Sequence, residues 1–387
     1  MRVLIIGGGI GGMTAGYAMS RAGLDAVVFE QVPDARKIYV GSGLHLWNNA
    51  VAALNSIGLG QKIAAAMGPN AVIHRLRMMS HTGRKLAEIP FDDTARKIGA
   101  DCIGVNRAEL LAMVAEEIDD SRKRLGVRCV GYRFDGDDVV ALFEDGSEER
   151  GDVLVGADGS RSVLRGQLLA DGRPSFAGYT IWEGHTEFPY DSAPIGTLPI
   201  TYGPGKRFAY YRVSESQLYW FAVGNAGEGE TDPEGRRKQL LLERFRGWPA
   251  PIEEIISVTD ESTMGRRDLY YREPEKKWGE GRMTLLGDAA HAMTFDIGQG
   301  AAQSIEDAVV LTKCLTSASD PQTALREYER IRMPRTRRLQ RISQRVGRIG
   351  RWSNPAAVRA RELIMRMTFG NPLFLKKFEQ DLIVNFD

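Results

Sequence analysis

The chain opens with Val3-Leu4-Ile5-Ile6-Gly7-Gly8-Gly9-Ile10-Gly11-Gly12, an apolar strand that runs directly into the pattern Gly-x-Gly-x-x-Gly. A second apolar run, residues 26–29, ends at Glu30 a helix-length later. A parallel β-α-β unit of this kind places the pyrophosphate of a dinucleotide at a helix N-terminus, where unpaired N–H groups and the helix dipole stabilise negative charge. The pattern predicts a dinucleotide site; the alternative is a tightly packed, glycine-rich helix start without a ligand.

Each residue of the pattern has an expected task. Gly7 lets the chain turn sharply, Gly9 lets the backbone approach phosphate, and Gly12 lets the helix pack closely on the strand. Glu30 is placed to accept hydrogen bonds from a ribose diol. The preceding strand, the following helix and the spaced acid make the motif far more specific than the glycines alone.

Composition sets limits on the kind of protein. With 387 residues, 43% hydrophobic and 26% charged, the chain has the size of about two soluble globular domains. A net charge of +1 gives no reason to expect nucleic acid as a partner, and no apolar run is long enough for a membrane span. The three cysteines are widely spaced and the five histidines lack metal-ligand spacing, so we expect no metal site and a cytoplasmic location.

Strand and helix signals alternate in a way that indicates two interleaved domains. Polar and apolar residues interleave around a Thr82-Gly83 turn, and residues 179–281 are strand-like and aromatic. After residue 286 the chain reads as helical to its end. We expect an α/β fold with three parts: a discontinuous nucleotide-binding domain at 1–72, 100–178 and 282–350, an inserted, mainly antiparallel β-sheet substrate domain at 73–99 and 179–281, and a helical C-terminal segment at 351–387.

Two further segments carry acids at the ends of apolar strands. The first is Val153-Leu154-Val155-Gly156-Ala157-Asp158-Gly159, and the second is Thr284-Leu285-Leu286-Gly287-Asp288. The second runs on into Gly298-Gln299-Gly300 and an Ala-rich helix. An acid at the C-terminal end of a strand can bind a ribose or ribityl hydroxyl. A glycine-rich helix start presents N–H groups to an electron-rich ring edge.

Together these motifs resemble the FAD-dependent monooxygenases of the para-hydroxybenzoate hydroxylase and salicylate hydroxylase type. The resemblance runs from Arg2 to about Arg351 through three motifs in the family's order. It implies a Rossmann-like FAD-binding domain carrying the inserted substrate domain. By resemblance the residues that bind FAD are Gly7, Gly9, Gly12, Glu30, Arg107, Asp158, Asp288, Gly298, Gln299, Gly300 and Ala301.

The resemblance also implies the reaction. NADH or NADPH, bound transiently, reduces FAD, O2 adds at flavin C4a, and the resulting hydroperoxide hydroxylates an aromatic or polyketide-like small molecule. The cofactor supplies this chemistry, while the protein orients the substrate and excludes water. The expected partners are therefore a small-molecule substrate and O2, and the chain is expected to be a monomer or homodimer.

One departure from the family pattern lies beside the flavin. Phe295 stands where the family usually has proline, in a segment that packs near the oxygen-reacting face. Asn48, in the stretch Gly41 to Ala50 that matches the family segment beside the flavin ring, also replaces a common proline. Two interpretations of Phe295 are open: a replacement that preserves hydroxylation, or a ring that alters or abolishes oxygenation.

Aromatic residues of the predicted substrate domain are the pocket candidates. Alternation along a strand sends Tyr219 and Phe221 to one face and Trp220 to the other. Arg212 or His45 is a candidate for the polar group that orients a phenolate or carboxylate. The full set of pocket candidates is Phe295, His45, Tyr211, Tyr219 and Phe221.

Two rival functions are compatible with the same motifs. One is a flavoprotein epoxidase or non-oxidative cyclase acting on an alkene-bearing natural product. The other is a binding protein that keeps FAD as a structural ligand. Residues 326–351, with ten arginines and two acids, predict an amphipathic helix whose basic face is either solvated or meets an anionic partner.

Overall fold

The computed structural model describes residues 1–34, 42–189 and 193–383; Gly41 of the stretch quoted above lies outside them. Its central feature is a six-stranded sheet in the order β17, β18, β11, β1, β2, β7. In that order the strands span Gly279–Glu280, Met283–Leu285, Val153–Gly156, Arg2–Ile6, Asp25–Glu30 and Lys123–Leu125. All neighbours pair in parallel except β17 with β18. The β-α-β unit expected at the N-terminus is therefore present.

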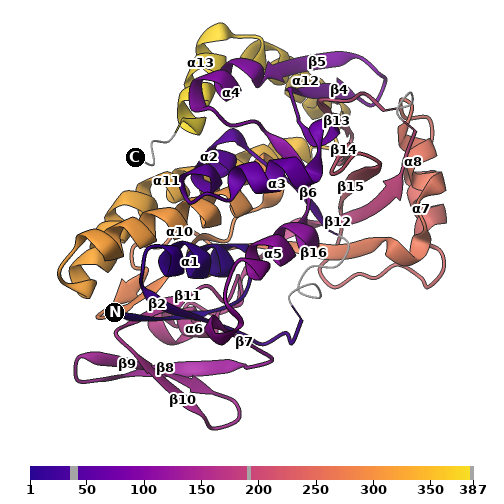
Figure 1. Cartoon of the computed structure of the whole chain (residues 1–387). Coiled ribbons are helices and arrows are strands. Elements are labelled where there is room, and N and C mark those ends of the chain that lie inside the picture. The colour runs from indigo at the N-terminus through magenta and orange to yellow at the C-terminus, as the bar shows by residue number, and fades with distance from the viewer. Residues whose placement is uncertain (35–41, 190–192, 384–387) are drawn as a thin grey trace.

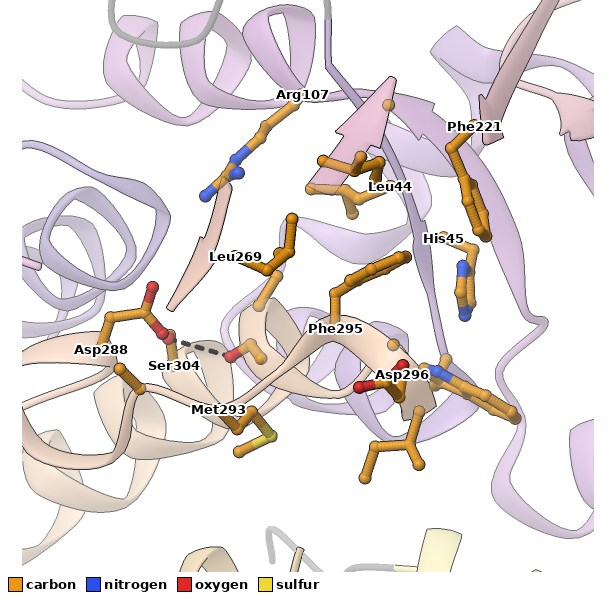
Figure 2. A pocket seen from close by; sticks show the side chains of 18 of the residues that line it. Leu44, His45, Arg107, Phe221, Leu269, Asp288, Met293, Phe295, Asp296 and Ser304 are labelled. Atoms are coloured by element: carbon orange, nitrogen blue, oxygen red, sulfur yellow. Dashed lines mark hydrogen bonds between the residues drawn. The ribbon is translucent and has the colours of Figure 1, made fainter. Parts of the chain in front are cut away.

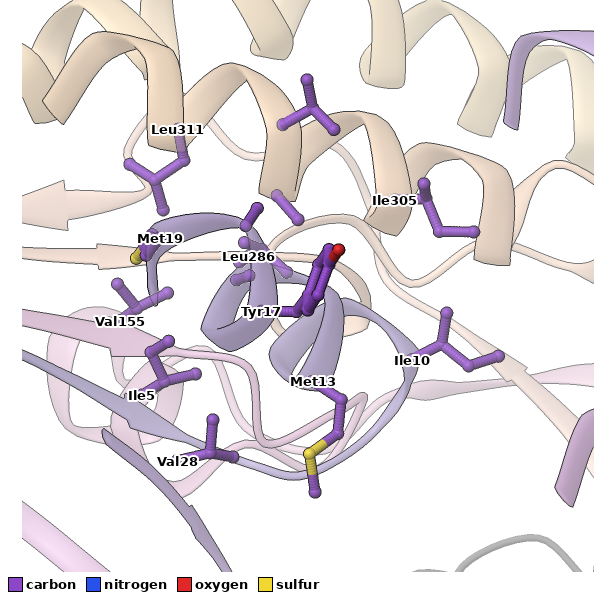
Figure 3. Close-up of a cluster of buried hydrophobic side chains, with 14 of the residues drawn as sticks. Ile5, Ile10, Met13, Tyr17, Met19, Val28, Val155, Leu286, Ile305 and Leu311 are labelled. Carbon is purple, nitrogen blue, oxygen red and sulfur yellow. The ribbon is translucent and has the colours of Figure 1, made fainter. Parts of the chain in front are cut away.

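Helix α1, Ile10–Arg21, packs against this sheet on one side and against α10, Gly300–Ser317, on the other. Figure 3 shows Met13 and Tyr17 of α1 between the strand residues and Ile305 of α10. The strands are short runs of Val, Ile and Leu because both faces of the parallel sheet are covered. This arrangement brings the N-termini of two helices to the carboxyl edge of the sheet.

A seven-stranded sheet forms the second layer, in the order β16, β12, β15, β14, β13, β4, β5. Its strands span, in that order, Gly265–Tyr271, Ser175–Glu187, Gln217–Asn225, Lys206–Arg212, Thr197–Gly203, Arg75–Ser80 and Lys85–Pro90. The pairs are antiparallel except β13 with β4. The mainly antiparallel second sheet and the α/β fold class are confirmed, whereas the domain boundaries stay a prediction.

The two faces of this sheet differ as alternation predicts. Tyr219 and Phe221 of β15 pack in the aromatic cluster that faces the first sheet. Trp220, between them, packs on the opposite face with Phe208 and Phe245. Helices α7, Arg237–Arg244, and α8, Ile252–Val258, cover that opposite face (Figure 1).

Two smaller sheets complete the strands. β8, β9 and β10 form a three-stranded sheet below the six-stranded one in Figure 1, and β3 pairs with β6 between the two large sheets. These strands span Cys129–Asp135, Asp138–Phe143, Glu148–Gly151, Gly43–Leu46 and Ile103–Asn106.

The remaining helices connect or cover the sheets. α11 packs along α10, and α12 packs against β5 at the far edge of the seven-stranded sheet. Among the described residues no helix is both long and apolar enough to cross a bilayer. The helices not yet bounded are α2 Asn48–Ser56, α3 Gly60–Met67, α4 Asp92–Ile98, α5 Arg107–Glu116, α6 Val163–Leu169, α9 Asp288–His291, α11 Pro321–Gly350, α12 Pro355–Phe369 and α13 Pro372–Leu382, with short 3-10 turns η2 Pro69–Ala71, η3 Asp120–Arg122, η5 Glu261–Thr263 and η6 Phe295–Ile297.

Candidate active site

A cavity of about 390 Å³ lies between the two large sheets. Pockets for small ligands usually measure about 300–1,000 Å³, so this cavity has the size of a ligand site. Its wall includes Gly9, Ile10 and Gly11 at the start of α1 and Gly298, Gly300 and Ala301 at the start of α10. The cavity therefore joins both glycine motifs singled out in the sequence.

Backbone N–H groups of two helices are left for a ligand in this cavity. No side chain among the described residues caps the N-terminus of α1 or of α10. The first N–H groups of a helix need a partner, and a phosphate or an electron-rich ring edge can supply it. A cavity with two uncapped helix starts fits a dinucleotide whose phosphates and ring occupy separate ends.

Two other glycines of the first motif, Gly7 and Gly12, lie outside the cavity lining. Gly7 has φ +110°, and a Cβ there would lie 2.3 Å from the carbonyl oxygen of Ala157. A Cβ on Gly12 would lie 1.9 Å from the carbonyl oxygen of Gly7. Neither residue lines the cavity, so these two glycines permit the turn and the close packing that bring Gly9 to it.

The two acids that follow the first strands are also set back. Glu30 accepts hydrogen bonds from the N–H of Gly8 at 2.6 Å and of Val32 at 2.8 Å. Asp158 accepts from the N–H of Val163 at 2.8 Å, and burial raises its pKa. Neither carboxylate is among the residues that line the cavity. Oδ1 of Asp158 has no partner within the described part of the chain.

Arg107 and Asp288 do line the cavity, on one side of it, as Figure 2 shows. Asp288 is exposed to the cavity at the start of α9. The preceding Gly287, at φ +63°, donates its N–H to the buried carboxylate of Asp307 at 3.0 Å. That contact holds the turn which presents Asp288.

Some residues of the loop before α10 line the cavity, and others are buried in the core. Gly298 has φ +65°, and a Cβ there would lie 2.4 Å from Nε2 of His45. The side chain of Gln299 is buried and accepts from Asn49 at 3.1 Å and Gln303 at 3.0 Å, so it does not line the cavity.

All five predicted pocket residues, Phe295, His45, Tyr211, Tyr219 and Phe221, line the cavity at its other end. The ring centroids of Phe221 and Phe295 are 5.3 Å apart, and those of Tyr211 and Tyr219 also 5.3 Å. The ring of His45 stands edge-on to Tyr211. Burial lowers the pKa of His45 to about 4, and its Nε2 has no partner among the described residues.

A buried carboxylate holds Tyr219 in place. The hydroxyl of Tyr219 donates to Oε2 of Glu183 at 2.6 Å, and Nε of Arg267 donates to Oε1 at 2.7 Å. Burial raises the pKa of Glu183, but the charge of Arg267 and these donors hold it below its ordinary value. Burial, with the neighbouring Glu183, raises the pKa of Tyr219 well above its ordinary value. The hydroxyl of Tyr219 therefore stays protonated and donates its hydrogen to Glu183.

The polar group facing the aromatic end is Arg207, which sequence reasoning missed. Its Nη2 donates to Oδ1 of Asp296 at 2.6 Å, and the hydroxyl of Tyr179 donates to Oδ2 at 2.7 Å. The guanidinium lies 5.0 Å from the centroid of Phe295. Arg207 is 3% exposed, and its Nη1 has no partner in the described ranges. Arg212, the sequence candidate, instead donates to the carbonyl oxygens of Phe188 and Pro189, both at 3.2 Å, and does not line the cavity.

Nothing in the sequence pattern singled out Arg207. It follows a Gly-Lys turn and stands at the start of a strand, where an arginine is usually solvated. Asp296 lies inside the loop that the motif analysis quoted, two residues before Gly298. Asp296 was the available signal, because a carboxylate that becomes buried in such a loop needs a cation to pair with it.

Metal chemistry has no matching donor set in the described residues, since no group of three or more His, Cys, Asp or Glu side chains could hold an ion there. The donors that do converge are backbone N–H groups, one arginine and one carboxylate at one end of the cavity. These are groups that bind phosphate, ribityl hydroxyls and a flavin ring edge. The residues present therefore fit FAD.

Comparisons with known proteins agree with this site. The family described as FAD binding domain matches residues 1–343. The aurachin C monooxygenase/isomerase of Stigmatella aurantiaca is 38% identical over 367 residues, covering 95% of this chain and 94% of its own. An FAD-dependent urate hydroxylase of Klebsiella pneumoniae is 33% identical over 344 residues, 88% of each chain. The crystal structure of Klebsiella pneumoniae HpxO with FAD and uric acid superposes with a TM-score of 0.90 at 29% identity, covering 99% of this chain and 96% of that one.

Proposed function

Because this chain belongs to the FAD binding domain family and is an FAD-dependent monooxygenase, we propose that it hydroxylates an aromatic small molecule carrying a ring oxygen, with NADH or NADPH and O2 as co-substrates. The observation that carries the substrate class is the guanidinium of Arg207, which belongs to the cavity wall. It is buried at the aromatic end of the FAD cavity, beside Phe295.

The protein's share of the reaction is binding and orientation. FAD, when bound, supplies the redox chemistry and the activation of O2. The N–H groups at the start of α1 would hold the pyrophosphate, and Asp288 would accept from ribityl hydroxyls. The start of α10 would bind the pyrimidine edge of the ring, and Arg107 would bind the pyrophosphate. Glu30 and Asp158 would accept from the cofactor only through lone pairs that the backbone bonds leave open.

Arg207 orients the substrate. Its guanidinium would attract a phenolate, carbonyl or enolate oxygen on the ring, which would place the neighbouring ring carbon toward the FAD end of the cavity. A hydrogen bond to a charged acceptor inside a dry site is stronger than one in water. Burial lowers the pKa of Arg207, but Asp296, Tyr202 and Tyr179 together raise it above its ordinary value, so the guanidinium keeps its charge.

Phe295 forms part of the wall between substrate and cofactor. It packs edge-on against Phe221 and lies under the guanidinium of Arg207. A ring fixed on two sides excludes water from the reacting centre without contributing a polar group. We therefore favour preserved hydroxylation over loss of oxygenation.

The test follows NADH and NADPH consumption by the FAD-loaded protein across a panel of phenols, quinolones and polyketides under 18O2. We expect at least one ring-oxygen compound to stimulate consumption and to gain one 18O atom, detected by mass spectrometry. An epoxide product would point to the alkene-oxidising alternative. Bound FAD that no compound allows NADH or NADPH to reduce would refute the proposal and favour a structural flavin.

The setting of the enzyme is also a proposal. A cytoplasmic location rests on cysteine usage, because Cys102, Cys129 and Cys314 are all buried thiols. Monomer and homodimer both remain compatible with the sequence.

A further inference from the structure

We propose that the substrate carries a hydrocarbon chain on its ring, and that this chain lies in an apolar arm of the cavity between strands β13, β4 and β5 and helices α12 and α13. The inference rests on the proposed function, since it extends the same cavity. The hydrocarbon chain is a part of the substrate that the residues at the FAD end of the cavity do not contact.

The lining of the cavity is divided by element. Every residue that β4, β5, α12 and α13 contribute to it is apolar: Leu76, Met78, Ile89, Phe369 and Phe378. The charged lining residues come from other elements and are Arg107, Arg207, Arg267, Asp268, Asp288 and Asp296. A polar substrate would leave its own groups unpaired in this arm, whereas a hydrocarbon loses nothing there.

Strand register makes the arm one continuous surface. Leu76 pairs with Ile89 on β5 and with Leu198 on β13, and Met78 pairs with Ile200. Paired residues on neighbouring strands project to the same face, as do residues two apart on one strand. These five side chains therefore form the floor of the arm, and all five line the cavity.

The same register connects the arm to the aromatic end. Ile200 pairs with Ala209 on β14, and Ala209 pairs with Phe221 on β15. From β15 to β4 there are three strand spacings, about 14 Å at roughly 4.8 Å each. Phe221, Ala209, Ile200 and Met78 thus share one face of the sheet, and Phe221, Ile200 and Met78 line the same cavity, so the arm continues from the aromatic end.

The C-terminal helices supply the roof. Phe378 of α13 contacts the ring of Trp47 at 5.7 Å between centroids, and Trp47 also lines the cavity. Phe369 ends α12, which packs on β5. Lys97 of α4 pairs with Glu379 of α13 at 2.7 Å, so α13 is held over the arm by an ion pair and a ring contact. Phe369 and Phe378 are only partly buried, which leaves apolar surface for a ligand to cover.

The test measures binding to the FAD-loaded full chain, through the change in flavin absorbance on titration. The probes are 4-alkylphenols and 2-alkylquinolones with methyl, butyl and heptyl chains. Burial of one methylene is worth about fourfold in Kd, so we expect Kd to fall steeply from methyl to heptyl. A Kd that does not change with chain length, while the methyl compounds still bind, would overturn the arm and leave the proposed function standing.

Two substitutions locate the effect. Ile200→Trp fills the arm and should shrink the heptyl-to-methyl ratio of Kd values toward one, compared with Ile195→Trp, at a position 48% exposed. Phe378→Ala removes part of the roof and should reduce the gain per methylene, compared with Leu373→Ala, 78% exposed on the same helix. Equal ratios in all four variants would contradict the arm. Failure of both ring series to bind at any length would overturn the arm and the proposed function together.

Discussion

His45 shows how far one residue departs from its sequence context. In the sequence it was a candidate for orienting a phenolate. In the fold it is half-buried between Trp47 and Tyr211, with its Nε2 close to Gly298. Because desolvation lowers the pKa of His45 to about 4, its imidazole is neutral near pH 7 and does not attract an anion. The anion-binding task falls to Arg207.

The pKa of His45 leads to a pH prediction. Its value is about 4 in the fold against 6.5 in the unfolded chain, so the unfolded state binds the extra proton first. The stability that a neutral His45 contributes is complete above pH 6.5 and is lost as the pH falls toward 4, by about 3 kcal/mol. Urea unfolding of wild type and His45→Phe between pH 7 and pH 4 should show a smaller loss in the variant. Parallel pH profiles would contradict a buried neutral imidazole.

At the scale of elements, the helix starts were predictable and their contacts were not. The glycine motifs correctly placed the N-termini of α1 and α10, because glycine positions and apolar runs are local properties. The amphipathic period of residues 326–351 likewise predicted α11. Its basic face, however, is partly internal: Arg332 is 2% exposed and pairs with Glu306 and Asp307 of α10. Which arginine turns inward depends on the partner helix.

The start of α10 supplies a test of the cofactor site. A Cβ on Gly300 meets no atom of the described chain within 4 Å, yet Gly300 lines the cavity. Gly300→Ala should leave the melting temperature of the apoprotein unchanged and weaken FAD binding at least tenfold, because the methyl group occupies cofactor space. Gly166→Ala is the matched control, since Gly166 lies in α6 with equally open surroundings but away from the cavity. Equal FAD affinity in both variants would place the flavin elsewhere.

At the scale of the whole molecule, an ion pair links the seven-stranded sheet to the loop before α10. Arg207 belongs to β14 of the seven-stranded sheet, and Asp296 belongs to η6, in the loop that precedes α10. Tyr179 of β12 completes the contact. The pair therefore holds the seven-stranded sheet against this loop and keeps the Arg207 guanidinium in the cavity wall.

A variant pair separates these two tasks. Arg207→Met leaves the Asp296 carboxylate buried without its cation and should lower the free energy of unfolding by about 3 kcal/mol. The double variant Arg207→Met, Asp296→Asn removes both charges and should recover most of that stability. Substrate affinity should fall at least tenfold in both, because neither retains the guanidinium in the cavity wall. Unfolding at one fixed FAD concentration and ligand titration are the measurements. Recovered substrate affinity in the double variant would exclude Arg207 as the orienting group.

What the sequence determined by itself was the β-α-β unit, the two glycine-bounded helix starts and the aromatic face of β15. All of these follow from runs, periods and spacings within a few dozen residues. Only the tertiary structure decided that Arg207 meets Asp296, 89 positions away, and that the cavity continues across β13 and β4 under α13. The reason is that strand order and register, rather than the local sequence pattern, bring distant side chains into contact. They also determine which of these side chains are buried away from solvent.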